Sequence, residues 1–246
     1  MSSVGLTREL AKKILPHSAQ EFYRAWRKLS EMEDAHTLVR LGPVHFQPLE
    51  WELQQVRQYI KSKVLNAGCG NRDLGDTLRG FGASEIINYD IESSIPGAIR
   101  GSLTETPFAS GEFDTIICNA VLEHVPEIER VMQELTRVLK YGGYFVACVP
   151  FLQPYHRSPT DFRRYTGEGL EELGRLHGLR TVEILPVHSI TQTLGWIAWE
   201  WAKEKGGWRA FGVYPIVWLS TRLFYKTDMR VRYNANGFQV IYTKEG

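Results

Sequence analysis

The sequence predicts a doubly wound α/β fold, and three observations carry this prediction. From Lys63 onward, short runs rich in β-branched and aromatic residues alternate with runs of helical periodicity. A glycine-rich turn follows the first expected strand, and an acidic residue ends the second. Because each crossover must return the chain to the same edge of the sheet, such alternation gives parallel strands with helices on both faces. The length of 246 residues suits one large domain.

The expected elements follow one another in a regular order from residue 63. Strands are expected at 63–67, 85–89, 98–101, 113–118 and 144–149, and later at 181–185 and 237–243. Helices are expected at 73–81, 126–140 and 167–177, where apolar residues recur every three or four positions. Residues 63–246 are therefore assigned to one main domain.

A helical extension is expected before this domain. Between Ser18 and Tyr59 the apolar residues recur at helical spacing, as at Phe22, Trp26 and Leu29. Residues 1–62 are therefore predicted to form helices that precede the first strand.

A second helical segment, residues 186–236, is predicted as an insertion before the last strand. It holds five of the seven tryptophans, and Ile190, Leu194, Ile197 and Trp201 recur at helical spacing. One interpretation is a helical cap that closes the core, and the other is a lid over an apolar substrate. Because the segment carries a net charge of +4, a third hypothesis rests it on an anionic membrane surface. The lid is favoured over the membrane, because the tryptophans form no continuous face and Pro215 interrupts the longest apolar run.

Charge and cysteine content exclude several classes of function. The 29 basic and 28 acidic residues leave a net charge of +1, which gives no general field for binding nucleic acid. Cys69, Cys118 and Cys148 are widely spaced and show no metal-ligand spacing, so buried free thiols are expected. The polar N-terminus lacks the apolar core of a signal peptide, and no apolar run is long enough to span a membrane. A cytoplasmic location is therefore expected.

The sharpest local signal is the run VLNAGCGNR, residues 64–72, at the end of the first strand. Gly68 and Gly70 let the backbone turn tightly and approach a ligand. Asp90, at the end of the second strand, can accept both hydroxyls of an adenosine ribose. Nicotinamide dinucleotides use a similar loop with a third glycine, where this chain has Asp73. A carboxylate there would repel a pyrophosphate, which favours an adenosine cofactor without phosphates.

Four segments in order resemble the class I S-adenosylmethionine-dependent methyltransferases, most closely the small-molecule group with a LEHV segment. They are VLNAGCGN, NYDIE, TPFASGEFDTIICNAVLEHV and VMQELTRVLKYGGYFVACVP. The resemblance runs from about Lys63 to Glu183. It implies a Rossmann-like, seven-stranded sheet whose last strand is antiparallel, and it implies S-adenosylmethionine as the cofactor.

The resemblance also implies roles for individual residues. Gly68 and Gly70 would line the methionine part of the cofactor, Asp90 would hold the ribose, and Ile91 would pack on the adenine. Asn119 and Ala120 would lie beside the methionine amine. The full set expected to line the cofactor is Asn66, Gly68, Cys69, Gly70, Asp90, Ile91, Ser102, Leu103, Asn119 and Ala120. Asn66 and Ser102 depart from the family pattern, which commonly has acidic residues at both positions.

The acceptor is expected to bind beyond the fourth and fifth strands, at the segment PFLQPYHRSPTDFRRYT. The residues expected to contact it are Tyr155, Arg163, Arg164, Tyr165 and, from the insertion, Trp196. His156 is the first candidate for a catalytic base and His124 is the second, because a neutral imidazole can take a proton near pH 7. Asp161 is expected to form an ion pair with the neighbouring arginines. Glu123 is a further candidate base, and no metal is expected because no matching second and third carboxylates follow.

Three functions remain in view. The leading one is methyl transfer to a small-molecule or lipid-linked acceptor, such as a secondary metabolite or a saccharide. The second is a catalytically silent adenosylmethionine-binding module, which Asn66 and Ser102 keep open. The third is a nicotinamide-dependent oxidoreductase, which Asp73 disfavours. The expected partner is a small molecule rather than nucleic acid, and the sequence leaves the oligomeric state and the acceptor's identity open.

Overall fold

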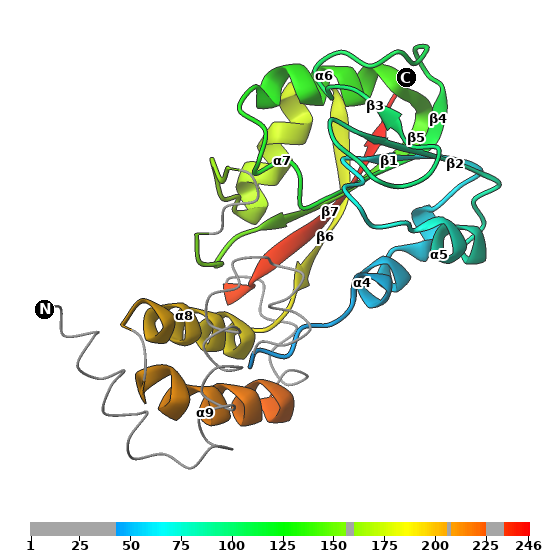
Figure 1. Cartoon of the computed structure of the whole chain (residues 1–246). Coiled ribbons are helices and arrows are strands. Elements are labelled where there is room, and N and C mark those ends of the chain that lie inside the picture. Colours follow the sequence, from blue (N-terminus) through cyan, green and yellow to red (C-terminus); the bar gives the residue numbers. More distant parts are fainter. Residues whose placement is uncertain (1–42, 156–159, 206–207, 225–233) are drawn as a thin grey trace, which may run out of the picture.

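A computed structural model of the chain describes residues 43–155, 160–205, 208–224 and 234–246. Seven strands form one sheet in the order β3-β2-β1-β4-β5-β7-β6 (Figure 1). The strands are β1 (Lys63–Ala67), β2 (Glu85–Asp90), β3 (Ile99–Arg100), β4 (Phe113–Asn119), β5 (Leu139–Pro150), β6 (Leu179–Val187) and β7 (Gly237–Lys244). Strands β1 to β5 pair in parallel, and β7 runs antiparallel to both β5 and β6. The predicted fold class, with its antiparallel last strand, is confirmed.

Helices cover both faces of this sheet (Figure 1). The helices of the main domain are α4 (Leu49–Gln55), α5 (Gly75–Gly80), α6 (Ile128–Val138) and α7 (Gly167–Leu176), with a 3-10 turn at Arg57–Tyr59. Helices α4 and α5 pack on the face that carries Val64, Ile117 and Ile241. Helices α6 and α7 pack on the other face, where Leu65 and Phe145 lie. Because side chains alternate along a strand, neighbouring residues of one strand enter different cores.

The predicted boundaries differ from the structure mainly at two strands. Strand β5 begins at Leu139 rather than at residue 144, because a register shift between Phe113 and Thr115 lets the chain pair with β4 earlier. Strand β6 is longer than expected at both ends, since its whole length pairs with β7. Of the predicted N-terminal extension, residues 1–42 lie outside the described residues, and the remainder holds α4 and the 3-10 turn.

The described part of the insertion holds α8 (Ile190–Lys205) and α9 (Trp208–Phe224), which lie beyond the end of β6 (Figure 1). Helix α8 forms as predicted, and three residues of its apolar stripe, Leu194, Ile197 and Trp201, are exposed. The contact between α8 and its surroundings instead buries Trp196, Trp199 and Ala202, at a spacing of three residues. No helix in the described part of the chain is long and apolar enough to cross a membrane.

Pro215 does not interrupt the insertion, contrary to the expectation. It lies inside α9, which continues to Phe224. A proline removes one backbone hydrogen bond from a helix, and here the packing against α8 and Val44 holds the turns on either side of it. Among the described side chains of α9, Ile216, Leu219 and Leu223 are apolar and exposed.

Candidate active site

The glycine turn after β1 adopts a backbone that other residues rarely take. Gly68 and Gly70 have φ angles of 71° and 53°. A Cβ atom on Gly68 would lie 2.4 Å from a methyl carbon of Val121, whereas a Cβ on Gly70 would meet nothing within 4 Å. The amides of Gly68 and Cys69 both donate to the carbonyl of Tyr89. Hydrogen bonds thus join the turn to the end of β2, and the turn has open space beside it at Gly70.

Asp90 joins this turn to the loop after β2. Its Oδ2 accepts from the Gly70 amide at 2.8 Å, and its Oδ1 accepts from the Glu92 amide at 2.7 Å. A carboxylate has about four acceptor sites, so both oxygens retain capacity for a ligand's hydroxyl groups. The next residue, Ile91, is 76% exposed. An exposed isoleucine beside an anchored carboxylate offers an apolar surface for a planar ring.

The end of β4 supplies a buried acceptor. The side-chain oxygen Oδ1 of Asn119 is buried and has no hydrogen-bond partner among the described residues. Ala120 follows with a left-handed φ of 54°, and its amide donates to the Cys148 carbonyl. Such strain in a residue other than glycine costs about 1–3 kcal/mol and often marks a ligand site. A group with N–H donors, such as an ammonium, would satisfy Asn119. We call residues 68–70, 90–91 and 119–120 the cofactor edge.

The two residues that depart from the family pattern have partners within the protein. Asn66 is buried and donates through Nδ2 to Oδ1 of Asn88 at 2.8 Å. The Ser102 hydroxyl lies 2.8 Å from that of Thr104. Leu103 and Cys69 are buried beside them in the chain. These side chains support the loops around the cofactor edge.

Asp73 lies just before the helix that follows the turn. Its Oδ1 accepts from the Gly75 amide at 2.8 Å, where α5 begins. This contact holds a negative charge where a dinucleotide would seat its pyrophosphate. The geometry favours a cofactor without phosphates.

Arg163 and Arg164, which follow β5, make hydrogen bonds within the protein. Arg164 forms a bidentate pair with Asp161 and also donates to the Pro154 carbonyl at 3.0 Å. Arg163 donates to the Pro126 carbonyl at 3.0 Å. The expected ion pair is confirmed for Arg164, and contacts from these two arginines to an acceptor stay a prediction.

The other residues predicted on the acceptor side are not gathered in one place. Tyr155 is exposed, whereas Tyr165 packs against the core of α6 and α7. Trp196 is buried beside Val44 and Val217, and its indole donates to Glu200. His156 lies outside the described residues. The structure therefore gives Trp196 a packing environment between the insertion and residue 44.

Glu123 and His124 follow the end of β4. His124 Nδ1 lies 2.7 Å from the Thr160 carbonyl, which can only accept, so Nδ1 carries the hydrogen. Its Nε2 lies 3.6 Å from Oε1 of Glu123, a fully buried carboxyl. Burial raises the pKa of Glu123 to about 7, and Arg164 offsets only part of this shift. Among the described residues no group of three or more His, Cys, Asp or Glu side chains could hold a metal.

Sequence reasoning missed three buried polar residues on the α4 side of the sheet. They are Glu52, His188 and Gln239. One signal was present, because Glu52 occupies the inward stripe of α4 between Leu49 and Leu53. A charged residue at an apolar position of a helix marks either an internal partner or a ligand.

Residues 65–147 match the family model described as "Methyltransferase domain". A ubiquinone biosynthesis O-methyltransferase of Xanthomonas oryzae is 30% identical over 115 residues, 41% of this chain and 46% of that protein. A mouse eEF1A lysine and N-terminal methyltransferase is 26% identical over 58% of this chain. The chain spans less than half of the length of these two relatives, and only 23% of the second.

Solved structures agree on the fold. The [4+2]-cyclase SpnF has a TM-score of 0.54 and 17% identity, covering 80% of this chain and 81% of that one. An S-adenosylmethionine-dependent methyltransferase of Archaeoglobus fulgidus has a TM-score of 0.53 and 16% identity, covering 80% and 93%. At this identity the likeness speaks for the fold alone. Residues 65–147 thus match a methyltransferase family, and the sheet has the fold of solved S-adenosylmethionine-dependent methyltransferases.

Proposed function

We propose that this protein transfers the methyl group of S-adenosylmethionine to a small-molecule acceptor that carries a hydroxyl or amino group. The observation that carries the proposal is the cofactor edge. One strand end holds an anchored carboxylate beside an exposed isoleucine, and another holds a buried amide oxygen without a partner among the described residues. These groups suit the ribose, the adenine and the methionine ammonium of one molecule.

The residues at the cofactor edge carry groups that suit each part of that cofactor. Asp90 would accept from the ribose hydroxyls, Ile91 would cover the adenine, and Asn119 would accept from the ammonium. The turn at Gly68 and Gly70 allows a close approach, and Gly70 leaves open space beside it. When bound, S-adenosylmethionine supplies a methyl group that the sulfonium already activates, and a neutral thioether is left after transfer.

The protein's own contribution is positioning and proton handling. Holding donor and acceptor in line can supply much of the rate enhancement. The chain's residues would hold the acceptor in line with the activated methyl group, and a base would take the proton that the acceptor's hydroxyl or amino group loses. His156 and His124 are the candidate bases. In the neutral imidazole of His124, the hydrogen on Nδ1 leaves the lone pair on Nε2, beside Glu123.

Titration calorimetry separates this function from its alternatives. We expect S-adenosylmethionine and S-adenosylhomocysteine to bind, and NAD not to bind. Release of S-adenosylhomocysteine is then followed with a panel of phenols, alcohols, amines and lipid-linked saccharides. Turnover matters because one protein of the same fold is described as a cyclase. Binding of NAD in place of S-adenosylmethionine would contradict the proposal, and cofactor binding without turnover of any panel member would favour the silent module.

A further inference from the structure

One row of side chains crosses the sheet from the cofactor edge to its other side. Asn119 of β4 is paired with Cys148 of β5, and Cys148 with Gln239 of β7. Residues opposite one another share a face of the sheet, and here it is the face that α4 covers. Neighbouring strands lie about 4.8 Å apart, so Gln239 is about 10 Å from Asn119. Gln239 therefore lies on the same face as Asn119, two strands away from the cofactor edge.

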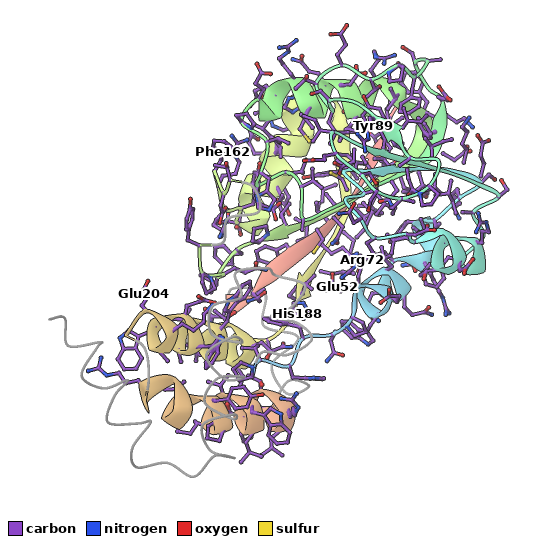
Figure 2. All side chains as sticks on the ribbon, in the orientation of Figure 1. Glu52, Arg72, Tyr89, Phe162, His188 and Glu204 are labelled. Carbon is purple, nitrogen blue, oxygen red and sulfur yellow. The ribbon has the colours of Figure 1, made fainter. Side chains whose placement is uncertain are left out.

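Glu52 of α4 lies above the middle of this row. It is only 8% exposed, and its Oε1 lies 3.1 Å from Nε2 of His188. Its Oε2 accepts from the Cys148 thiol at 3.7 Å. Burial, followed by the Glu52 charge, raises the pKa of Cys148, so that residue stays a neutral thiol and donates. Figure 2 shows Glu52 and His188 close together between α4 and the insertion.

His188 is held in an unusual backbone conformation. Its φ is 59°, a left-handed value that costs a residue other than glycine about 1–3 kcal/mol. The side chain is 8% exposed and packs edge-on against the Phe46 ring. The strained backbone and the ring contact together keep the imidazole against Glu52. The carboxylate is thus oriented from two sides and still retains acceptor sites.

Beside this pair lies a cleft of about 410 Å³ between α4 and the ends of β6 and β7. Trp51, Leu185, Pro186 and Val187 form its apolar walls, and Glu52 and Gln239 supply buried polar groups. Gln239 is 2% exposed, and its Nε2 has no hydrogen-bond partner among the described residues. No lysine or arginine lines the cleft in the described part of the chain. We call this the α4 cleft.

We propose that the α4 cleft binds the methyl acceptor and selects a small molecule that joins an apolar body to a hydroxyl or amino group. The assignment rests on the proposed function, and it names the acceptor class for that function. Its volume lies in the range of small-molecule sites. Glu52 accepts a hydrogen bond from the donor group, and Gln239 donates to an oxygen of the ligand. An anionic ligand is rejected, because a buried carboxylate with no cation lining the cleft repels it.

Three aromatic probes of matched size test this selection: phenethylamine, 2-phenylethanol and phenylacetate. Their affinities are measured by ligand-observed NMR titration on the full chain, with and without S-adenosylhomocysteine. We expect phenethylamine and 2-phenylethanol to bind and phenylacetate to bind at least tenfold more weakly. Glu52→Gln should weaken phenethylamine at least tenfold, because a charge-assisted hydrogen bond contributes about 1.5–3 kcal/mol. The loss for 2-phenylethanol should be smaller, since the glutamine oxygen still accepts.

Two control variants keep the test sharp. Glu50→Gln removes a carboxylate from the exposed side of the same helix and should leave all three affinities unchanged. Leu185→Trp fills the cleft without removing the pair of Glu52 and His188, and should weaken phenethylamine and 2-phenylethanol alike.

Failure of the cleft and failure of the proposed function give different results. S-adenosylhomocysteine is titrated into every variant, and its affinity should not change. If S-adenosylhomocysteine does not bind even the wild type, the proposed function fails whatever the probes do. If S-adenosylhomocysteine binds but Glu52→Gln has the wild-type affinity for phenethylamine, the pair of Glu52 and His188 only stabilises the fold. That result overturns the cleft proposal. Equal binding of phenylacetate and phenethylamine would overturn it as well.

Discussion

The cofactor edge is made mostly of backbone turns, whereas the α4 cleft is made of side chains from elements far apart in the chain. At the cofactor edge, two glycines, one carboxylate and one amide follow strand ends, and each is recognisable within a few residues of sequence. In the α4 cleft, Glu52 comes from a helix before β1, and His188 and Gln239 come from beyond β5. The residues of the cofactor edge can therefore be recognised from short stretches of sequence, whereas those of the α4 cleft come together only once the sheet has assembled.

The largest expected effect concerns catalysis rather than binding. If His156 is the base, His156→Ala should lower turnover by about 10²–10⁴ and leave S-adenosylhomocysteine affinity unchanged. The wild-type rate should rise with pH through an ionisation near neutrality. Steady-state kinetics across pH, with His124→Ala as the companion variant, distinguishes the two histidines. A flat profile and near-normal turnover of His156→Ala would transfer the role to His124 or to positioning alone.

The next effect tests the backbone turn of the cofactor edge. Gly68→Ala should lower the free energy of unfolding by about 2–5 kcal/mol, because left-handed strain adds to a clash with Val121. Gly70→Ala is the matched control, and it should cost only the strain of about 1–2 kcal/mol. Chemical denaturation measures both. Equal losses would show that Val121 yields and that the turn is looser than its geometry indicates.

A third effect concerns the pH dependence of stability, through the buried carboxyl of Glu123. Its folded-state pKa of about 7 exceeds the ordinary value of 4.5, so the folded protein binds a proton more tightly than the unfolded chain. Stability should therefore fall as pH rises from about 4.5 to 7, and by about 1–3 kcal/mol for this group.

Glu123→Gln should remove that part of the pH dependence. Relative to wild type, the variant should gain stability between pH 5 and pH 8, as measured by urea denaturation at both values. Glu127→Gln is the control, because Glu127 lies on the surface and pairs with Arg130. Parallel pH profiles for wild type and Glu123→Gln would show that Glu123 does not titrate in this range.

The smallest expected effect concerns the insertion. One of the two reasons for favouring a lid is wrong, because α9 runs through Pro215. The apolar stripe of α8 at Leu194, Ile197 and Trp201 is also exposed. Arginines flank the exposed rings, with Arg222 4.3 Å from the Trp218 centroid. We therefore expect partial, salt-sensitive sedimentation with phosphatidylserine vesicles, reduced in Ile216→Ser/Leu219→Ser. If the protein does not sediment with these vesicles at low salt, the lid is the better interpretation of the insertion.

The order of strands and helices could be predicted from the sequence, because apolar residues recur every second position in a strand and every three or four positions in a helix. The alternation of strands with helices then indicated a parallel sheet. The glycine turn and its link to Asp90 could also be predicted, because Gly68, Gly70 and Asp90 meet through local geometry, whereas their role in binding a cofactor stays a prediction. The direction of α8 could not be predicted, because both of its sides carry large apolar residues and only the position of α9 decides between them. Glu52 was missed because its partner His188 lies far away in the sequence. The two side chains meet only in the folded protein.

The most direct test of the account is the affinity of S-adenosylhomocysteine for Asp90→Ala, measured by calorimetry beside Glu92→Ala and Glu52→Gln. If Asp90 accepts from the ribose hydroxyls as proposed, these charge-assisted hydrogen bonds contribute about 1.5–3 kcal/mol. We expect at least a tenfold loss for Asp90→Ala, and wild-type affinity for Glu92→Ala at the exposed neighbour and for the α4 cleft variant Glu52→Gln. Unchanged affinity in Asp90→Ala, or an equal loss in Glu52→Gln, would contradict the division of this site into a cofactor edge and an acceptor cleft.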